Sequence, residues 1–95
     1  MTAVLVTPQA IEDLDDLIRS HGLPGDARQR VRRSLRPLER FPRMGRALGG
    51  RWDGARFVLG PWPWLVIVYD HDEDRDEVVV LTAHDARSAT SATGT

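Results

Sequence analysis

The 95-residue chain contains neither cysteine nor lysine. Without cysteine it can form no disulfide and no thiolate metal site, which is typical of a protein from a reducing cytoplasm. Its longest apolar run is far too short to span a bilayer, and its N-terminus lacks the basic and apolar segments of a signal peptide. We therefore expect a cytoplasmic protein with no membrane association. The length suits one domain, expected over residues 1–87, with a flexible polar tail at 88–95.

Because lysine is absent, all 13 basic residues are arginine, and they are unevenly distributed. Positions 28 to 56 hold ten arginines and two acidic residues, a net charge of +8. Positions 70 to 77 hold six acidic residues and one arginine, a net charge of −5. Such a polarised chain suits an anionic partner on its basic side, although a solvated helix face would have the same composition.

Two amphipathic helices are predicted in the N-terminal half. Thr7-Pro8 is typical of a helix start, and His21-Gly22 is typical of a helix end. The second helix should begin with Asp26 as its N-cap and should break near Pro37. The apolar stripes of the two helices consist of Ile11, Leu14, Leu17, Ile18, Val31, Leu35, Leu38 and Phe41.

Short apolar segments predict five strands, at residues 3–6, 46–48, 56–59, 63–69 and 78–83. The last two flank an acidic stretch, 70–76, which we expect to be a solvated loop. The order β-α-α-β-β-β-β predicts an α+β domain in which two N-terminal helices pack on one face of a small, mostly antiparallel sheet. The residues expected under the helices in the central sheet are Val66, Val68, Val79 and Leu81.

No metal or cofactor site is predicted. Asp70, Asp72 and Asp74 have the opening spacing of a calcium-binding loop. However, the sixth position is Arg75 rather than glycine, and the twelfth is Leu81 rather than glutamate.

The order of the elements and several local sequences resemble the RelE/ParE superfamily of toxins from type II toxin–antitoxin systems. The matching pieces are Thr7-Pro8-Gln9-Ala10, Phe41-Pro42, Arg56–Gly60, the strand that ends at Tyr69, and Val78–Leu81 followed by His84. The resemblance implies a cognate antitoxin as partner and growth inhibition by ribosome-dependent cleavage of mRNA. Two alternatives remain open, namely poisoning of DNA gyrase as in the ParE branch and a catalytically inert antitoxin-binding module.

The resemblance leaves enzymatic activity open, because the usual arginine of the central strand and the C-terminal tyrosine are missing. Cleavage through a 2′-hydroxyl needs an acid, a base and a cation at the phosphate. The residues that could supply them, provided that they converge on one sheet face, are His84, Arg56, Arg51 and Arg87. A strand-end histidine such as His84 more often has no special role, and Arg56 and Arg51 are more often solvated strand arginines or antitoxin contacts. The three tryptophans, Trp52, Trp62 and Trp64, could stack on bases but are more often core or interface residues.

The basic segment is the predicted antitoxin surface. The resemblance implies that an extended or helical antitoxin tail, often acidic, covers such a surface, and arginine forks bind carboxylates bidentately. We expect contacts from several of Arg32, Arg36, Arg40, Arg46 and Arg51, beside an exposed apolar groove.

Overall fold

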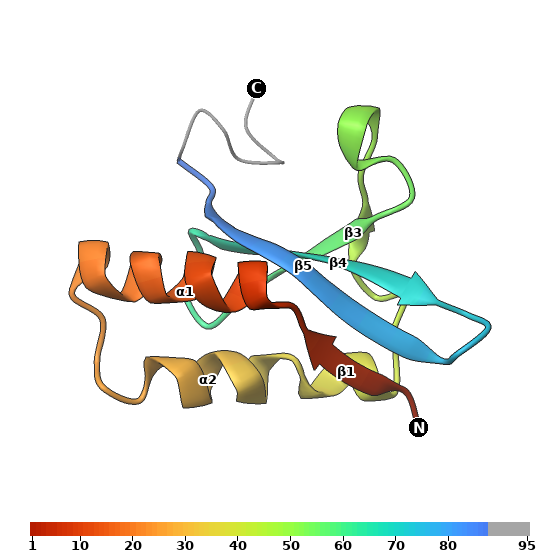
Figure 1. The fold of residues 1–95 in the computed structure, drawn as a ribbon, viewed down its shortest axis with the longest axis horizontal. Helices are drawn as coiled ribbons and strands as arrows, with labels where there is room; N and C mark the ends of the chain where they lie inside the picture. Colours follow the sequence, from red (N-terminus) through yellow and green to blue (C-terminus); the bar gives the residue numbers. More distant parts are fainter. Residues whose placement is uncertain (88–95) are drawn as a thin grey trace.

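The computed structural model describes residues 1–87 and has two helices packed on one face of a five-stranded sheet (Figure 1). The strands are β1 Ala3–Val6, β2 Arg46–Ala47, β3 Arg56–Leu59, β4 Leu65–Asp72 and β5 Glu77–Asp85. The helices are α1 Pro8–His21 and α2 Ala27–Ser34, with short 3₁₀ helices η1 Arg36–Glu39 and η2 Gly50–Trp52. The strand order is β1-β5-β4-β3-β2; β1 runs parallel to β5 and the other neighbours are antiparallel. The predicted α+β class and helix arrangement are confirmed, while the expected tail at 88–95 lies outside the described residues.

The helix boundaries follow from local sequence. The Thr7 hydroxyl accepts a hydrogen bond from the Ala10 N–H (3.2 Å), and Pro8 occupies the first helical position of α1. Gly22 ends α1 with φ 60°, a left-handed conformation that costs glycine little. Beyond α2, Pro37 lies in η1, so the predicted interruption of the second helix is confirmed. The Asp26 prediction was wrong in one respect: its side chain caps no N–H and pairs with Arg30 instead (3.0 Å).

One core lies between the helices and the sheet. Its buried members are Ala10, Val31, Leu35, Leu38, Leu65, Ile67, Tyr69, Val78, Val80 and Ala83. A second, smaller cluster lies on the other face of the sheet, where Val66, Val68 and Ala55 are buried. Its partly buried cover includes Leu48, Trp52, Phe57 and Leu81. β4 therefore contributes to both cores, which explains its unbroken apolar run.

This arrangement corrects the predicted covering of the sheet. Val66, Val68 and Leu81 face away from the helices, and Val79 is only half-buried. The strand residues that pack under the helices are Leu65, Ile67, Val78 and Val80, because successive residues of a strand point to opposite faces. Ile11, predicted to cover the sheet, is 45% exposed, and Phe41, placed on the apolar stripe of the second helix, is 63% exposed.

The hairpin is longer than predicted. β4 begins at Leu65, so Trp64 precedes the strand, and it continues through Asp72 into the stretch expected to be a loop. Asp70, His71 and Asp72 pair with residues 77–79 of β5, and a register irregularity lies at Val68/Tyr69. Only residues 73–76 form the turn. The acidic side chains of Asp70 and Asp72 can belong to a strand because they are exposed or half-buried there.

No helix within residues 1–87 is long and apolar enough to cross a membrane.

Candidate functional site

An apolar groove of about 490 Å³ lies between α1, α2 and the sheet. Val31 and Leu35 of α2, Ala10 and Leu14 of α1, and the strand residues Val4, Val6, Ile67, Val80 and Ala83 line it. Val6 and Ile11 line the groove and are nearly half exposed (44% and 45%). Apolar surface of this kind on a small protein is typical of a binding site.

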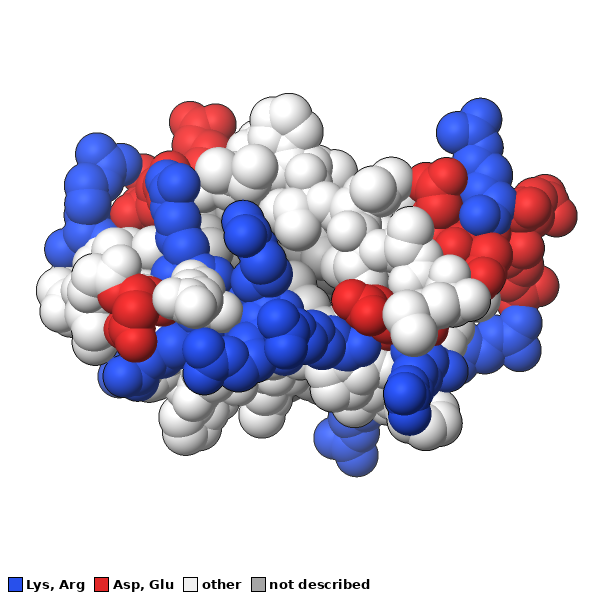
Figure 2. All heavy atoms as spheres, turned by 90° about the horizontal axis from the view of Figure 1, so that it is seen from below, with Lys and Arg blue, Asp and Glu red and all other residues white. Residues whose placement is uncertain are grey.

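Three arginines of α2 and η1 line the same groove, Arg28, Arg32 and Arg36, together with one carboxylate, Glu39. Four-residue spacing places them on one side of a helical segment. Figure 2 views the molecule from below and shows a band of basic side chains along this face, with a large acidic cluster where the β4–β5 hairpin lies and smaller acidic groups elsewhere. The charge asymmetry predicted from the sequence is therefore a property of the folded surface.

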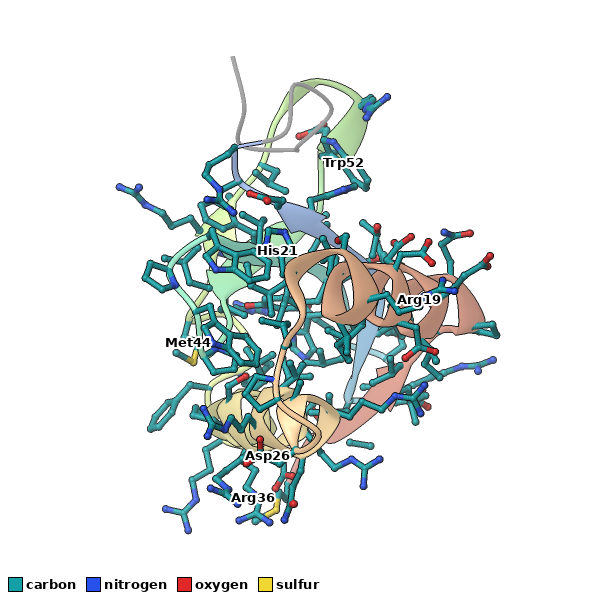
Figure 3. All side chains as sticks on the ribbon, turned by 90° about the vertical axis from the view of Figure 1, so that its left-hand side faces the viewer. Arg19, His21, Asp26, Arg36, Met44 and Trp52 are labelled. Carbon is teal, nitrogen blue, oxygen red and sulfur yellow. The ribbon has the colours of Figure 1, made fainter. Side chains whose placement is uncertain are left out.

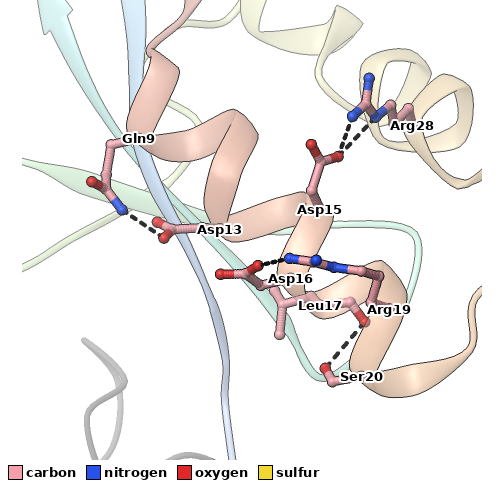
Figure 4. A network of polar contacts seen from close by, with 8 residues as sticks. All are labelled: Gln9, Asp13, Asp15, Asp16, Leu17, Arg19, Ser20 and Arg28. Atoms are coloured by element: carbon pink, nitrogen blue, oxygen red, sulfur yellow. Dashed lines mark hydrogen bonds and ion pairs between the residues drawn. The ribbon is translucent and has the colours of Figure 1, made fainter.

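The groove arginines differ in their partners. Arg28 reaches across to Asp15 of α1, with its Nε 2.9 Å from Oδ1, and so links the two helices (Figure 4). Arg32 and Arg36 are exposed and make no ion pair within residues 1–87. They are available to carboxylates of another molecule.

The other predicted antitoxin contacts lie outside the groove. Arg40 follows η1, Arg46 is on the edge strand β2, and Arg51 is in η2. Figure 3 shows Arg36 on the helix side of the molecule and Trp52, the neighbour of Arg51, at the opposite end. Of this set, only Arg32 and Arg36 line the groove.

His84 and Arg51 are neighbours on the sheet face away from the helices. His84 lies opposite Val66 in the ladder, and its ring meets the Trp52 indole edge-to-face at 5.7 Å. The Arg51 guanidinium lies 5.2 Å from the Trp52 ring. Burial lowers the pKa of His84; nearby Asp13 opposes this effect, and Arg51 adds to it. The His84 Nε2 is enclosed and has no hydrogen-bond partner within residues 1–87.

Arg56 lies on the opposite face of the sheet. It pairs with Tyr69 in the ladder, and directly opposed residues share a face, so Arg56 points to the helix side. Its Nη1 donates to the Gly45 carbonyl (2.9 Å), while the Gly45 N–H donates to the Tyr69 hydroxyl (3.0 Å). A Cβ on Gly45 would lie 2.6 Å from the Phe57 carbonyl oxygen, so only glycine fits there. Burial raises the pKa of Tyr69; the Gly45 hydrogen bond and then Arg56 oppose it.

Arg87 occupies a third position, at the C-terminal end of α1. It donates to Asp85 from Nε (3.1 Å) and Nη2 (3.0 Å), and His21 Nε2 lies 3.0 Å from the same carboxylate. The Arg87 hydrogen bonds lower the pKa of Asp85 to about 2. Trp64 stacks on His21 at 4.1 Å, and Arg87 lies 5.7 Å from its ring. This cluster joins the end of α1 to the end of β5.

The four predicted catalytic residues therefore occupy three places. His84 and Arg51 lie on the sheet face away from the helices, which we call the open sheet face. Arg56 lies on the helix-side face of the sheet, and Arg87 lies at the C-terminal end of α1. Sequence reasoning missed Asp13, which accepts hydrogen bonds from the Thr82 hydroxyl and the Ala83 N–H at the edge of β5. Asp13 belongs to the acidic half of α1, and no spacing in the sequence distinguishes it from its neighbours.

Residues 4–89 match the family described as the ParE toxin of type II toxin–antitoxin systems, parDE. The chain belongs to this family of toxins, as the resemblance to the RelE/ParE superfamily predicted. A comparison with curated proteins finds no match.

Solved structures of toxins share the fold. The match in the chromosomal ParDE system of P. aeruginosa has a TM-score of 0.70 at 18% identity and covers 92% of this chain and 98% of that one. The match in the RelBE2 toxin–antitoxin complex of Mycobacterium tuberculosis has a TM-score of 0.64 at 24% identity and covers 88% of this chain and 96% of that one. The match in the intact E. coli RelBE complex has a TM-score of 0.68 at 13% identity and covers 93% of this chain and 100% of that one. These similarities support the α+β fold independently of the family match.

Proposed function

We propose that this toxin inhibits growth by acting on DNA gyrase in the cytoplasm, and that a cognate antitoxin neutralises it by occupying the groove between α1 and α2. The observation that carries the choice of target is the separation of His84 from Arg56 by the sheet. A toxin that acts by binding a protein target through its surface needs no converging acid, base and cation.

Cleavage of a phosphodiester requires those groups within hydrogen-bond reach of one reacting site. Arg56 points to the helix side and His84 to the open side, with the buried residues of β4 between them. The enclosed Nε2 of His84 also limits proton transfer through that atom. Both observations favour the gyrase alternative over an endoribonuclease.

Ribosome-dependent mRNA cleavage remains the second candidate, because Arg51, Trp52 and His84 lie together on the open sheet face. A cation, an aromatic ring and an imidazole in one place are components of an RNA-binding and cleaving site. This candidate assigns the catalytic role to His84 and Arg51, and leaves Arg56 and Arg87 to structural roles.

The groove suits an amphipathic segment of the antitoxin. Its apolar floor would take the apolar side chains of that segment, and Arg32 and Arg36 would pair with its carboxylates. The solved relatives in the ParDE and RelBE systems are toxins of toxin–antitoxin pairs, which supports a partner of this kind.

One experiment separates the candidates. The purified chain is added to a gyrase supercoiling assay and to a translation extract in which mRNA ends are mapped. We expect inhibited supercoiling with accumulated gyrase–DNA cleavage complexes, intact mRNA, and full potency of His84→Ala. Codon-specific mRNA cuts that disappear in His84→Ala would replace this proposal with the second candidate. A folded chain without either effect would identify an inert antitoxin-binding module.

A further inference from the structure

A second hollow lies beside the β4–β5 hairpin. Figure 1 shows this hairpin at the opposite end of the molecule from the turn between α1 and α2. It has a volume of about 260 Å³ and is lined by Arg43, Gly54, Arg56, His71 and Glu73. None of these residues lines the groove between the helices. The hollow is therefore a separate site, and its lining is dominated by ionisable side chains.

Arg56 is a half-buried cation without a counterion. Its Nη1 donates to the Gly45 carbonyl, and no carboxylate within residues 1–87 lies within ion-pair distance of it. A guanidinium has five N–H donors, so most of its donors remain free for a ligand. Because a partly buried charge is costly when it is unpaired, an anion in the hollow would compensate Arg56.

Arg43 provides a second cation at the same hollow. It forms an ion pair with Glu73, and both side chains are largely exposed (60% and 63%). Exposed ion pairs of this kind are weak, so an anion that also contacts Arg56 can replace Glu73 as the partner of Arg43. Glu73 then acts as an internal competitor for the site.

His71 adds an enclosed imidazole ring to the lining of the hollow. Its side chain is 13% exposed, and neither ring nitrogen has a hydrogen-bond partner within residues 1–87. The nearest carboxylate oxygen, Asp76 Oδ1, lies 3.7 Å from Nε2 and already accepts a hydrogen bond from the Thr2 hydroxyl (2.7 Å). Asp76 thus faces His71 from the turn, while Arg43, Arg56 and Glu73 share its hollow. Since both nitrogens are enclosed, the ring forms part of the wall of the hollow.

We propose that this hollow binds an oxyanion of the phosphate class between Arg56 and Arg43, with displacement of Glu73. The planar guanidinium fork matches the oxygens of a phosphate group bidentately. The proposal is independent of the function proposed above, because binding of the anion does not require gyrase, mRNA or the antitoxin groove. The same chemistry is available from free inorganic phosphate and from a phosphodiester.

The test is an NMR titration of the full chain with inorganic phosphate and, separately, with dimethyl phosphate. Sodium chloride holds the ionic strength constant, because general screening also moves arginine resonances. We expect saturable shifts of the Arg56 and Arg43 Nε–H signals and of the His71 ring. Saturation by both anions assigns a phosphodiester-compatible site, and saturation by inorganic phosphate alone assigns a site for free phosphate. Shifts that match those in chloride alone would overturn the proposal.

Matched variants separate the site from the general charge of the hairpin. Arg56→Gln should weaken binding about tenfold, the effect of one lost charge-assisted hydrogen bond. Glu73→Gln should strengthen binding, since it releases Arg43. Arg75→Gln and Asp74→Asn make the same charge changes in the turn between β4 and β5, outside the hollow, and we expect them to alter binding much less.

Equal effects of Arg75→Gln and Arg56→Gln would show a diffuse electrostatic response and overturn the proposal. So would weaker binding in Glu73→Gln. If Arg56→Gln does not fold, Glu73→Gln and Arg56→Lys still test the site, because Lys keeps the charge and loses the fork. Arg56→Lys should therefore bind phosphate more weakly than the wild type.

Discussion

At the scale of single residues, the electrostatics concentrate at a few carboxylates that join distant parts of the chain. Asp85 receives both Arg87 and His21, and Asp13 covers the edge of β5 beyond its pairing with β1. These contacts connect the two ends of the sequence. They depend on the tertiary fold, so no local pattern indicated them.

Asp85 gives a prediction for the pH dependence of stability. Its pKa is about 2 in the folded chain and about 3.9 in an unfolded one. The folded state therefore binds fewer protons, and the stabilisation is complete above the unfolded pKa and is lost as pH falls toward 2. We expect Asp85→Asn to lower the free energy of unfolding at pH 6, and this loss to diminish steadily between pH 4 and pH 2.

Urea unfolding of the wild type and the variant across this pH range measures the effect. Asp74→Asn is the control, because the Asp74 carboxylate makes no ion pair within residues 1–87. A loss in Asp85→Asn that is the same at pH 6 and pH 2 would contradict the assignment of the shift to Arg87 and His21.

At the scale of elements, the helix-side face of β5 is more deeply buried than its other face, although Val78, Val79 and Val80 are three consecutive valines. Val78 is fully buried under the helices, whereas Val79 is half-buried on the other face. Val→Thr keeps the shape and adds a hydroxyl that costs about 1–3 kcal/mol when it is buried without a partner. We expect Val78→Thr to lower the unfolding free energy by about that amount and Val79→Thr to change it little.

Chemical denaturation of the two variants measures this difference directly. Each serves as the control for the other, because the substitution and the strand are the same. Equal losses would mean that the assignment of faces in β5 is wrong.

The second element-scale prediction concerns the arginine row of α2 and η1. The double variant Arg32→Glu/Arg36→Glu should slow association with the antitoxin by about tenfold or more at low salt, because charges at the docking groove steer the encounter. Arg40→Glu/Arg46→Glu makes the same change in net charge outside the groove. We expect a smaller effect from it.

Stopped-flow or surface-binding kinetics at two salt concentrations give the association rates. The steering effect should decrease as salt rises, since exposed charges are screened. Equal slowing by the two double variants would mean that net charge, and not the groove, determines association.

Elements with local signals could be predicted from the sequence, and their contacts could not. Thr7-Pro8, Gly22 and Pro37 act on adjacent backbone, so the helix boundaries they predict agree with the structure. Asp70–Asp72 looked like a loop because acidic residues disfavour strands, yet pairing with residues 77–79 overrides that preference. The face of Arg56 relative to His84 depends on register, and a shift of one residue would reverse it.

At the scale of the whole molecule, the groove between the helices, the open sheet face and the hollow beside the β4–β5 hairpin all border the same sheet. β4 contributes Leu65 and Ile67 to the helix-side core and Val66 and Val68 to the other core. All four are at most 1% exposed. A local loss of either core would therefore expose one side of the same central strand, and the two cores are coupled through it.

This coupling predicts that the domain unfolds in a single transition. Trp52 reports on the open-face core, whereas Trp64 packs on His21 at the end of α1 and reports on the helix side. One variant, Trp62→Phe/Trp64→Phe, retains only Trp52, and the other, Trp52→Phe/Trp62→Phe, retains only Trp64. In each variant, the fluorescence transition in urea should coincide with the loss of helical circular dichroism, because neither core survives without β4. The comparison is made within each variant, since the substitutions themselves change stability. A Trp52 transition that precedes the loss of helix would show that the open-face core unfolds separately and that β4 does not couple the two sides.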